Sequence, residues 1–220
     1  MTEKQDQLRR EMIEICRIMH RKGLIAASDG NVSLRLDAER ILITPSMISK
    51  GFMTADQIAV MDLKGNLLEG PLPPSSEKFM HLKAYELRPE IQAVIHAHPP
   101  LAIAATLAGV SLEEPILPEV MVTLGGIPST PYATPASPQA VEVIQAPIKA
   151  GRNALVITRH GSLTLGKTLL EAYNFLEKVE HTAMVLLAAR PLGPIAPLPE
   201  DEVKLLKFMG QAAGYLPLEE

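Results

Sequence analysis

Apolar residues near the start of the chain recur at intervals of three and four, with charged residues between them. This spacing predicts an amphipathic helix, and Gly23 follows it as a stop signal. We interpret Cys16 as a core residue of this helix, because buried cysteine mostly behaves as a small hydrophobic side chain. The apolar set comprises Leu8, Met12, Ile15, Cys16 and Met19.

The period changes from helical to alternating after residue 30. Residues 32–36 alternate between apolar and polar, a short polar turn follows, and residues 41–44 form an apolar run. Residues 58–63 and 67–68 flank the turn sequence Lys64-Gly65-Asn66 in the same way. Both pairs predict β-hairpins, so the sheet begins by antiparallel pairing.

Helical and strand patterns then follow one another to the end of the chain. After the proline-rich stretch 70–74, Ser75 or Ser76 can cap a helix that runs to about Arg88, with Glu77 in its first turn. The patterns together predict a three-layer α/β/α fold, in which helices flank a central, largely antiparallel sheet. Further strands are predicted at 93–98 and 154–159, and further helices at 99–107, 168–190 and 200–209.

Length and composition narrow the class of protein. At roughly 150 residues per domain, 220 residues predict a single domain over residues 1–220. No apolar run approaches the roughly 20 residues that a membrane-spanning helix needs, and the polar N-terminus is unlike a signal peptide. We therefore expect a cytoplasmic protein with no membrane partner. The formal net charge of −4 argues against a nucleic-acid partner.

Three of the six histidines occupy positions suited to a metal ion. His96 and His98 are two residues apart in a predicted strand, so both side chains lie on one face and can converge on one ion. The alternative is a pair of hydrogen-bonded histidines at a strand end. His160 ends another apolar strand, and Gly161 leaves space beside its ring. Three neutral imidazoles with an open fourth position are typical of catalytic zinc, although Mn²⁺, Co²⁺ and Fe²⁺ also accept imidazole.

Glu77 is a candidate acid/base for such a site. It lies near a predicted helix N-terminus, where backbone N–H groups favour anions. Small hydrogen-bonding residues occur in turns flanked by glycine or proline, and groups of this kind can hold a phosphate without a cluster of basic side chains. Each could equally serve only as a cap or turn residue. They are Asn31, Ser46, Ser75 and Ser76.

Five short motifs give the chain a family resemblance. In their order and spacing they resemble the class II aldolase/adducin family, nearest to its fuculose-phosphate aldolases. The resemblance covers nearly the whole chain. It implies a central antiparallel sheet between helical layers and a homotetramer with active sites between neighbouring subunits. The motifs are Gly30-Asn31-Val32-Ser33, Ile43-Thr44-Pro45-Ser46, Pro74-Ser75-Ser76-Glu77, His96-Ala97-His98 and His160-Gly161.

The resemblance also implies residue roles. The zinc ligands would be His96, His98 and His160, and Glu77 would be the carboxylate that shuttles the proton. The phosphate of a sugar-phosphate substrate would be held by Asn31, Ser46, Ser75, Ser76 and the backbone N–H of Met47.

Two positions depart from the family pattern. The family usually has glycine at Met47, and a backbone donor survives that change. Before Gly125-Gly126 the aldolase pattern has a tyrosine that serves a neighbour's site, whereas this chain has Glu119. Tyr215 is the counterpart of a second tyrosine that the family places over a neighbour's site.

The sequence thus favours a zinc-dependent aldolase that cleaves a ketose 1-phosphate, through an enediolate, to dihydroxyacetone phosphate and an aldehyde. Enzymes of the same fold are the alternatives: a methylthioribulose-1-phosphate dehydratase, a ribulose-phosphate 4-epimerase or a decarboxylase. The epimerase pattern carries aspartate at the position of Glu77, which counts against it. A non-catalytic adducin-like module would have lost the metal ligands, and all three are present.

Overall fold

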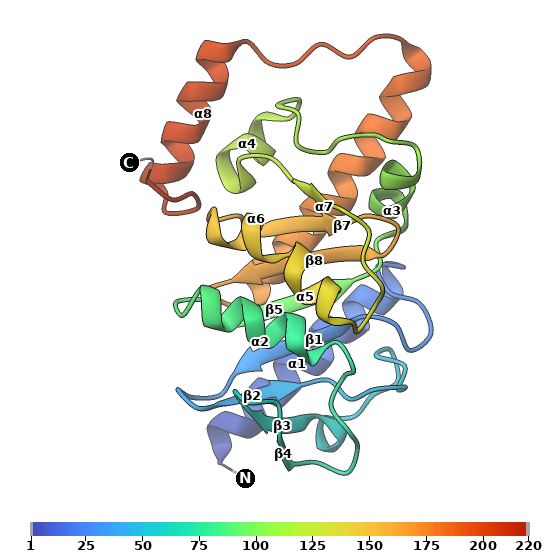
Figure 1. Ribbon diagram of the computed structural model, residues 1–220, viewed down its shortest axis with the longest axis vertical. Helices are drawn as coiled ribbons and strands as arrows, with labels where there is room; N and C mark the ends of the chain where they lie inside the picture. Colours follow the sequence, from blue (N-terminus) through green and yellow to red (C-terminus); the bar gives the residue numbers. More distant parts are fainter. Residues whose placement is uncertain (1, 219–220) are drawn as a thin grey trace.

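An eight-stranded sheet runs through the computed structural model, which describes residues 2–218 (Figure 1). The strand order is β4-β3-β2-β1-β5-β8-β7-β6, and only the β6–β7 pair among these neighbours is parallel. Both predicted hairpins, β1–β2 and β3–β4, are confirmed. The strands are β1 (Asn31–Arg35), β2 (Arg40–Ile43), β3 (Ala59–Asp62), β4 (Leu67–Glu69), β5 (Ala93–Ala97), β6 (Ser129–Thr130), β7 (Ala154–Ile157) and β8 (Gly161–Gly166).

Helices cover both faces of this sheet, which confirms the predicted three-layer arrangement (Figure 1). The α1 and α7 helices pack on one face, and α2, α5 and α6 pack on the other. Within residues 2–218, none of the helices combines the length and apolarity that a membrane span needs. The helices are α1 (Glu3–Arg21), α2 (Lys78–Leu87), α3 (Pro100–Leu107), α4 (Pro118–Leu124), α5 (Pro138–Val143), α6 (Gln145–Lys149), α7 (Leu169–Ala189) and α8 (Glu200–Ala212).

Alternation along β1 and β5 sorts polar from apolar residues. On β1, Val32 and Leu34 join the core beneath α1 and α7. Because successive side chains of a strand point to opposite faces, Asn31 and Ser33 lie on the face that α2 covers. His96 lies on that same face of β5, since its neighbours Ile95 and Ala97 belong to the α1 side. The buried polar residues Asn31 and Ser33 of β1 and His96 of β5 therefore share the face that α2 covers.

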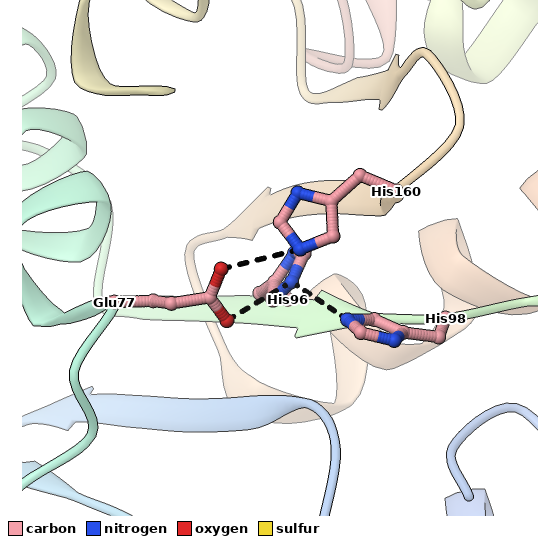
Figure 2. A group of neighbouring side chains, drawn as sticks. All are labelled: Glu77, His96, His98 and His160. Atoms are coloured by element: carbon pink, nitrogen blue, oxygen red, sulfur yellow. Dashed lines mark hydrogen bonds and ion pairs between the residues drawn. The ribbon is translucent and has the colours of Figure 1, made fainter. Parts of the chain in front are cut away.

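The α2 helix begins one or two residues later than predicted, since neither Ser75 nor Ser76 is its N-cap residue. Glu77 is its N-cap residue and lies outside the first turn, where the sequence pattern placed it. The reason is a turn at Ser75, whose Oγ accepts the Glu77 N–H at 3.2 Å and whose carbonyl oxygen accepts the Lys78 N–H at 3.2 Å. This turn precedes the helix and directs the Glu77 side chain toward the strands (Figure 2).

Candidate metal centre

Four side chains from three parts of the sequence converge at one end of the central strands (Figure 2). His96 is the fourth residue of β5, His98 follows that strand, and His160 lies in the turn between β7 and β8. Antiparallel pairing of Ala97 with Ser162 brings the turn before β8 next to the end of β5. One ligand atom from each histidine and from Glu77 lies within 4.8 Å of all the others.

Gly161 allows this close approach. A Cβ atom at this position would lie 2.3 Å from the Ala97 carbonyl oxygen, and 3.0 and 3.1 Å from ring atoms of His98 and His96. Any side chain would push the two strands or the two rings apart. The glycine is thus required by the packing of the site, as well as by the space beside His160.

Contacts outside the group of four orient the rings of two histidines. The Ser162 carbonyl oxygen, 2.9 Å from His96 Nδ1, can only accept, so Nδ1 carries a proton and Nε2 is the nitrogen that faces the group, where it would bind a cation through its lone pair. On His98, Asp29 Oδ2 lies 3.5 Å from Nδ1 and favours the same tautomer. The two Nε2 atoms are 3.0 Å apart. Two facing lone pairs repel, whereas a cation that both could bind at about 2.1 Å would relieve the repulsion.

Glu77 completes the donor set. Its Oε2 lies 3.3 Å from His96 Nε2 and its Oε1 lies 3.2 Å from His160 Nε2 (Figure 2). Burial alone raises the pKa of Glu77, but its contacts with His160 and His96 outweigh that effect and leave the pKa below its ordinary value. Among residues 2–218, neither Glu77 Oε1 nor His160 Nδ1 has a hydrogen-bond partner, although both atoms are buried.

The charge states suit a divalent cation. Burial first, and then His96 and His160, lower the pKa of His98 to about 4, so its imidazole is neutral at pH 7. A neutral imidazole is the form that binds a metal. Imidazole nitrogens and one carboxylate match the preferences of zinc and of neighbouring transition metals, and the residues present therefore fit such an ion.

The predicted phosphate residues lie beside this group. Ser46 Oγ donates to the Pro74 carbonyl oxygen at 3.2 Å and accepts the Ser76 N–H at 3.1 Å. These bonds join the loop after β2 to the turn that carries Ser75 and Glu77. Asn31 Nδ2 donates to Glu77 Oε2 at 2.9 Å. The structure thus brings Asn31, Ser46, Ser75 and Ser76 together around one side of Glu77.

Met47 has the backbone conformation of a glycine. Its φ of 59° lies in the left-handed region, which explains why the family pattern has glycine at this position. The Met47 residue is 85% exposed, so its side chain is not packed into the loop.

Glu119 and Tyr215 lie elsewhere in the subunit. Glu119, near the start of α4, lines a groove with Lys22, Lys178 and His181. Tyr215 follows α8, and its ring centroid lies 6.5 Å from that of Phe175. Neither residue belongs to the group of four in its own subunit. Their predicted action in a neighbour's site stays a prediction.

The sequence analysis did not single out three residues near the site. His81 is fully buried between Asn31 and Ser33, Lys50 is 2% exposed, and Asp29 lies beside His98. The one signal for His81 is its position four residues after Glu77, which places both on one face of a helix. Lys50 lies in the loop after β2 and leaves no comparable signal.

The fold and this centre define a family of enzymes. The chain belongs to the class II aldolase family, since residues 10–187 match the class II aldolase and adducin N-terminal domain. This finding confirms the family and the fold that the five motifs indicate.

Named relatives cover nearly the same length. The chain is 31% identical to the 3-oxo-tetronate 4-phosphate decarboxylase of Haemophilus influenzae, over 91% of this chain and 96% of that protein. It is 34% identical to the L-fuculose phosphate aldolase of Methanococcus maripaludis, over 80% of this chain and 93% of that protein. A solved structure of L-fuculose 1-phosphate aldolase matches with a TM-score of 0.85 at 29% identity, covering 93% and 96% of the two chains.

Proposed function

We propose that the protein is a metal-dependent class II aldolase, which cleaves a ketose 1-phosphate into dihydroxyacetone phosphate and an aldehyde. One observation carries the proposal: the Glu77 carboxylate lies within 3.3 Å of the Nε2 atoms of two histidines, beside a loop of small hydrogen-bonding residues. A proton carrier, a cation site and an anion site thus lie within reach of one small substrate.

The serine loops would bind the phosphate. Ser75 and Ser76 offer hydroxyl donors and Met47 offers a backbone N–H, without a basic side chain, which suits an anion held at a turn. The Ser46 hydroxyl would donate to the phosphate in place of the Pro74 carbonyl oxygen. A phosphate fixed there would orient the sugar so that its third carbon faces Glu77, and binding energy would be converted into orientation.

Glu77 would move the proton. Cleavage breaks the C3–C4 bond, converts the C4 hydroxyl into the aldehyde with loss of its proton, and leaves an electron pair on C3 that takes up a proton. Glu77 would deliver that proton at C3. A group from the neighbouring subunit, Glu119 or Tyr215, would take the hydroxyl proton.

His96, His98 and His160, together with Glu77 at rest, would hold the ion, and zinc is our choice among the metals that imidazole binds. A bound divalent ion supplies Lewis-acid stabilisation of negative charge on substrate oxygens. We further propose a homotetramer in the cytoplasm, with each active site completed by a neighbour.

A decarboxylase is the second candidate. The relative from Haemophilus influenzae that matches over 91% of this chain is named a 3-oxo-tetronate 4-phosphate decarboxylase. Loss of carbon dioxide from a 3-oxo acid also leaves an electron pair on the carbon next to a carbonyl group. The same cation site and the same proton donor would therefore serve either reaction.

The deciding experiment measures products. The purified protein, loaded with zinc, is incubated in parallel with ketose 1-phosphates and with a 3-oxo acid 4-phosphate. Release of dihydroxyacetone phosphate and an aldehyde from a ketose 1-phosphate supports the aldolase. Release of carbon dioxide from the 3-oxo acid 4-phosphate supports the decarboxylase, which would leave dihydroxyacetone phosphate as its second product. Neither product, with zinc bound at one ion per chain, would contradict both.

A further inference from the structure

Two rows of polar residues interlock between β1 and α2. The row on the strand has a polar residue at every second position: Asn31, Ser33 and Arg35. The row on the helix has one at every fourth position, from the N-cap residue onward: Glu77, His81 and Tyr85. Two residues of strand advance about 6.6 Å and four residues of helix about 6 Å, so the rows stay in step. The strand face and the helix face therefore meet residue by residue.

Hydrogen bonds connect the rows into one chain that ends at Glu77. Tyr85 Oη and Ser33 Oγ are 2.9 Å apart, and Ser33 Oγ is 2.7 Å from His81 Nδ1. His81 Nε2 is 2.5 Å from Asn31 Oδ1, and Asn31 Nδ2 is 2.9 Å from Glu77 Oε2. The His81 side chain is fully buried and Asn31 is 3% exposed, so water does not compete for these bonds.

The donor and the acceptor of each hydrogen bond can be assigned by starting from Glu77, at the end of the chain of bonds. A carboxylate accepts, so the Asn31 amide nitrogen faces Glu77 and the amide oxygen faces His81. That oxygen can only accept, so His81 Nε2 carries a proton. Burial lowers the pKa of His81 to about 3, so its ring is neutral at pH 7 and Nδ1 accepts from the Ser33 hydroxyl. Ser33 in turn accepts from Tyr85.

We propose that His81 is a positioning residue for Glu77, acting through Asn31. Its Nε2–H holds the Asn31 amide in the one orientation that directs an N–H at Glu77 Oε2. Without that bond, the amide can rotate and place its carbonyl oxygen against the carboxylate. His81 touches neither the substrate nor the cation site, and its effect reaches the chemistry only through the direction of Asn31.

The same bonds limit what Asn31 can offer a substrate. Its oxygen is engaged by His81 and one of its two amide hydrogens by Glu77. One N–H remains. Asn31 therefore serves a phosphate or a substrate oxygen as a single donor. The role of Asn31 toward a substrate rests on the proposed function, whereas the orientation of its amide group does not.

Nuclear magnetic resonance tests the orientation in the full-length zinc-loaded protein. Long-range ¹H–¹⁵N spectra distinguish the two neutral tautomers of His81, with the His81→Gln spectrum assigning the signal. We expect the proton on Nε2. A proton on Nδ1 would overturn the proposal. Because this readout needs no turnover, it stands even if no ketose phosphate is cleaved and the proposed function fails.

Graded substitutions test the consequence. His81→Gln keeps an N–H near the Nε2 position, whereas His81→Leu and His81→Asn remove it. We expect kcat to fall about 10- to 100-fold in the Leu and Asn variants, the usual cost of losing an outer-shell partner, with KM within about threefold and zinc still at one per chain. The Gln variant should stay within about threefold of the natural enzyme. The Asn variant retains a partner for Ser33 and serves if the Leu variant does not fold.

Tyr85→Phe is the matched control. It removes a buried hydroxyl from the same chain of hydrogen bonds but leaves the His81–Asn31 bond in place. We expect lower stability with kcat within about threefold. The proposal would be overturned if His81→Gln were as slow as His81→Leu. It would also be overturned if Tyr85→Phe lowered kcat as much as His81→Leu does.

Discussion

The Lys50 ammonium donates a hydrogen bond to the Ser28 carbonyl oxygen at 2.6 Å, and it does so inside the protein, where Lys50 is 2% exposed. A second carbonyl oxygen, that of Pro45, lies 3.4 Å away. Ser28 precedes the strand that carries Asn31, and Pro45 precedes Ser46. One buried cation therefore joins the two loops that carry Asn31 and Ser46, two of the residues proposed to bind the phosphate.

Lys50→Met tests this anchor. The substitution keeps the length of the side chain but leaves two carbonyl groups without their donor, and an unsatisfied buried polar group costs about 1 to 3 kcal/mol. We expect urea unfolding to register a loss in that range and KM for a ketose 1-phosphate to rise. Lys64→Met, at an exposed turn, is the control. Equal stability of the two variants would show that Lys50 anchors nothing.

Substitution of His96, His98 or His160 by Ala should each remove most of the bound zinc and the activity while the protein stays folded. The ion is proposed to be catalytic, and the hydrophobic core is large enough for the protein to fold without it. Elemental analysis and circular dichroism check the two halves of this prediction. His181→Ala, at an exposed position of α7, should retain zinc. If one of these variants still bound one zinc ion per chain, the histidine replaced in it would not be a ligand.

Glu77→Gln should retain the metal and the fold but slow turnover about 10²- to 10⁴-fold, the usual range for a lost general acid/base. The amide still accepts the hydrogen bond from Asn31, so the geometry is preserved and only proton transfer is lost. Glu86→Gln, on the exposed side of α2, is the control and should leave turnover unchanged. A fall of less than about threefold in Glu77→Gln would reduce Glu77 to a capping residue.

Acid should destabilise the protein through His81. The pKa of this histidine is about 3 in the folded protein and 6.5 when the ring is free. The unfolded chain thus binds more protons between pH 3 and pH 6.5. The stability is present above pH 6.5 and is lost as the pH falls toward 3, by up to about 1.4 kcal/mol per pH unit.

The measurement is urea unfolding at pH 7, 6, 5 and 4, with His81→Gln beside the natural sequence. The glutamine side chain does not titrate, so its curve should fall less steeply with pH. Parallel curves for the two proteins would mean that His81 is not buried as a neutral ring.

Glu119→Gln tests the position where the chain departs most from the family pattern. If Glu119 reaches a neighbour's site, its charge repels an anionic aldehyde, and we expect a neutral aldehyde product. Turnover on ketose 1-phosphates should then fall in the variant, measured beside ketose bisphosphates. An unchanged rate and substrate ranking would assign Glu119 only to the groove that it shares with Lys22 and Lys178.

Most of the sheet could be predicted because its strands are apolar or strictly alternating. The β8 strand was missed because glycines bound it and because its polar residues, Ser162 and Thr164, are buried alongside its apolar ones. Ser162 to Leu165 do alternate between polar and apolar residues, but the alternation covers only four residues between two glycines, which ordinarily indicate turns. The α5 helix is only six residues long, too short for a helical period to stand out.

Some residues of the candidate site could likewise be predicted from the sequence, and others could not. His96, His98 and Glu77 belong to short motifs, which survive in the sequence whatever the packing. His81 and Lys50 are defined by burial, and burial arises only when α2 and the loop after β2 pack against the sheet. A histidine on a helix and a lysine in a loop are ordinarily solvated, so no local pattern separates these two residues from surface ones.

The group of four is not equally closed on all sides. The His98 side chain is 22% exposed and its neighbour Asp29 is 50% exposed, whereas the side chains of His96, His160 and Glu77 are 0%, 7% and 11% exposed. His98 and Asp29 therefore form the open side of the group of four, and a divalent ion that bound there would meet these two side chains before it met His96.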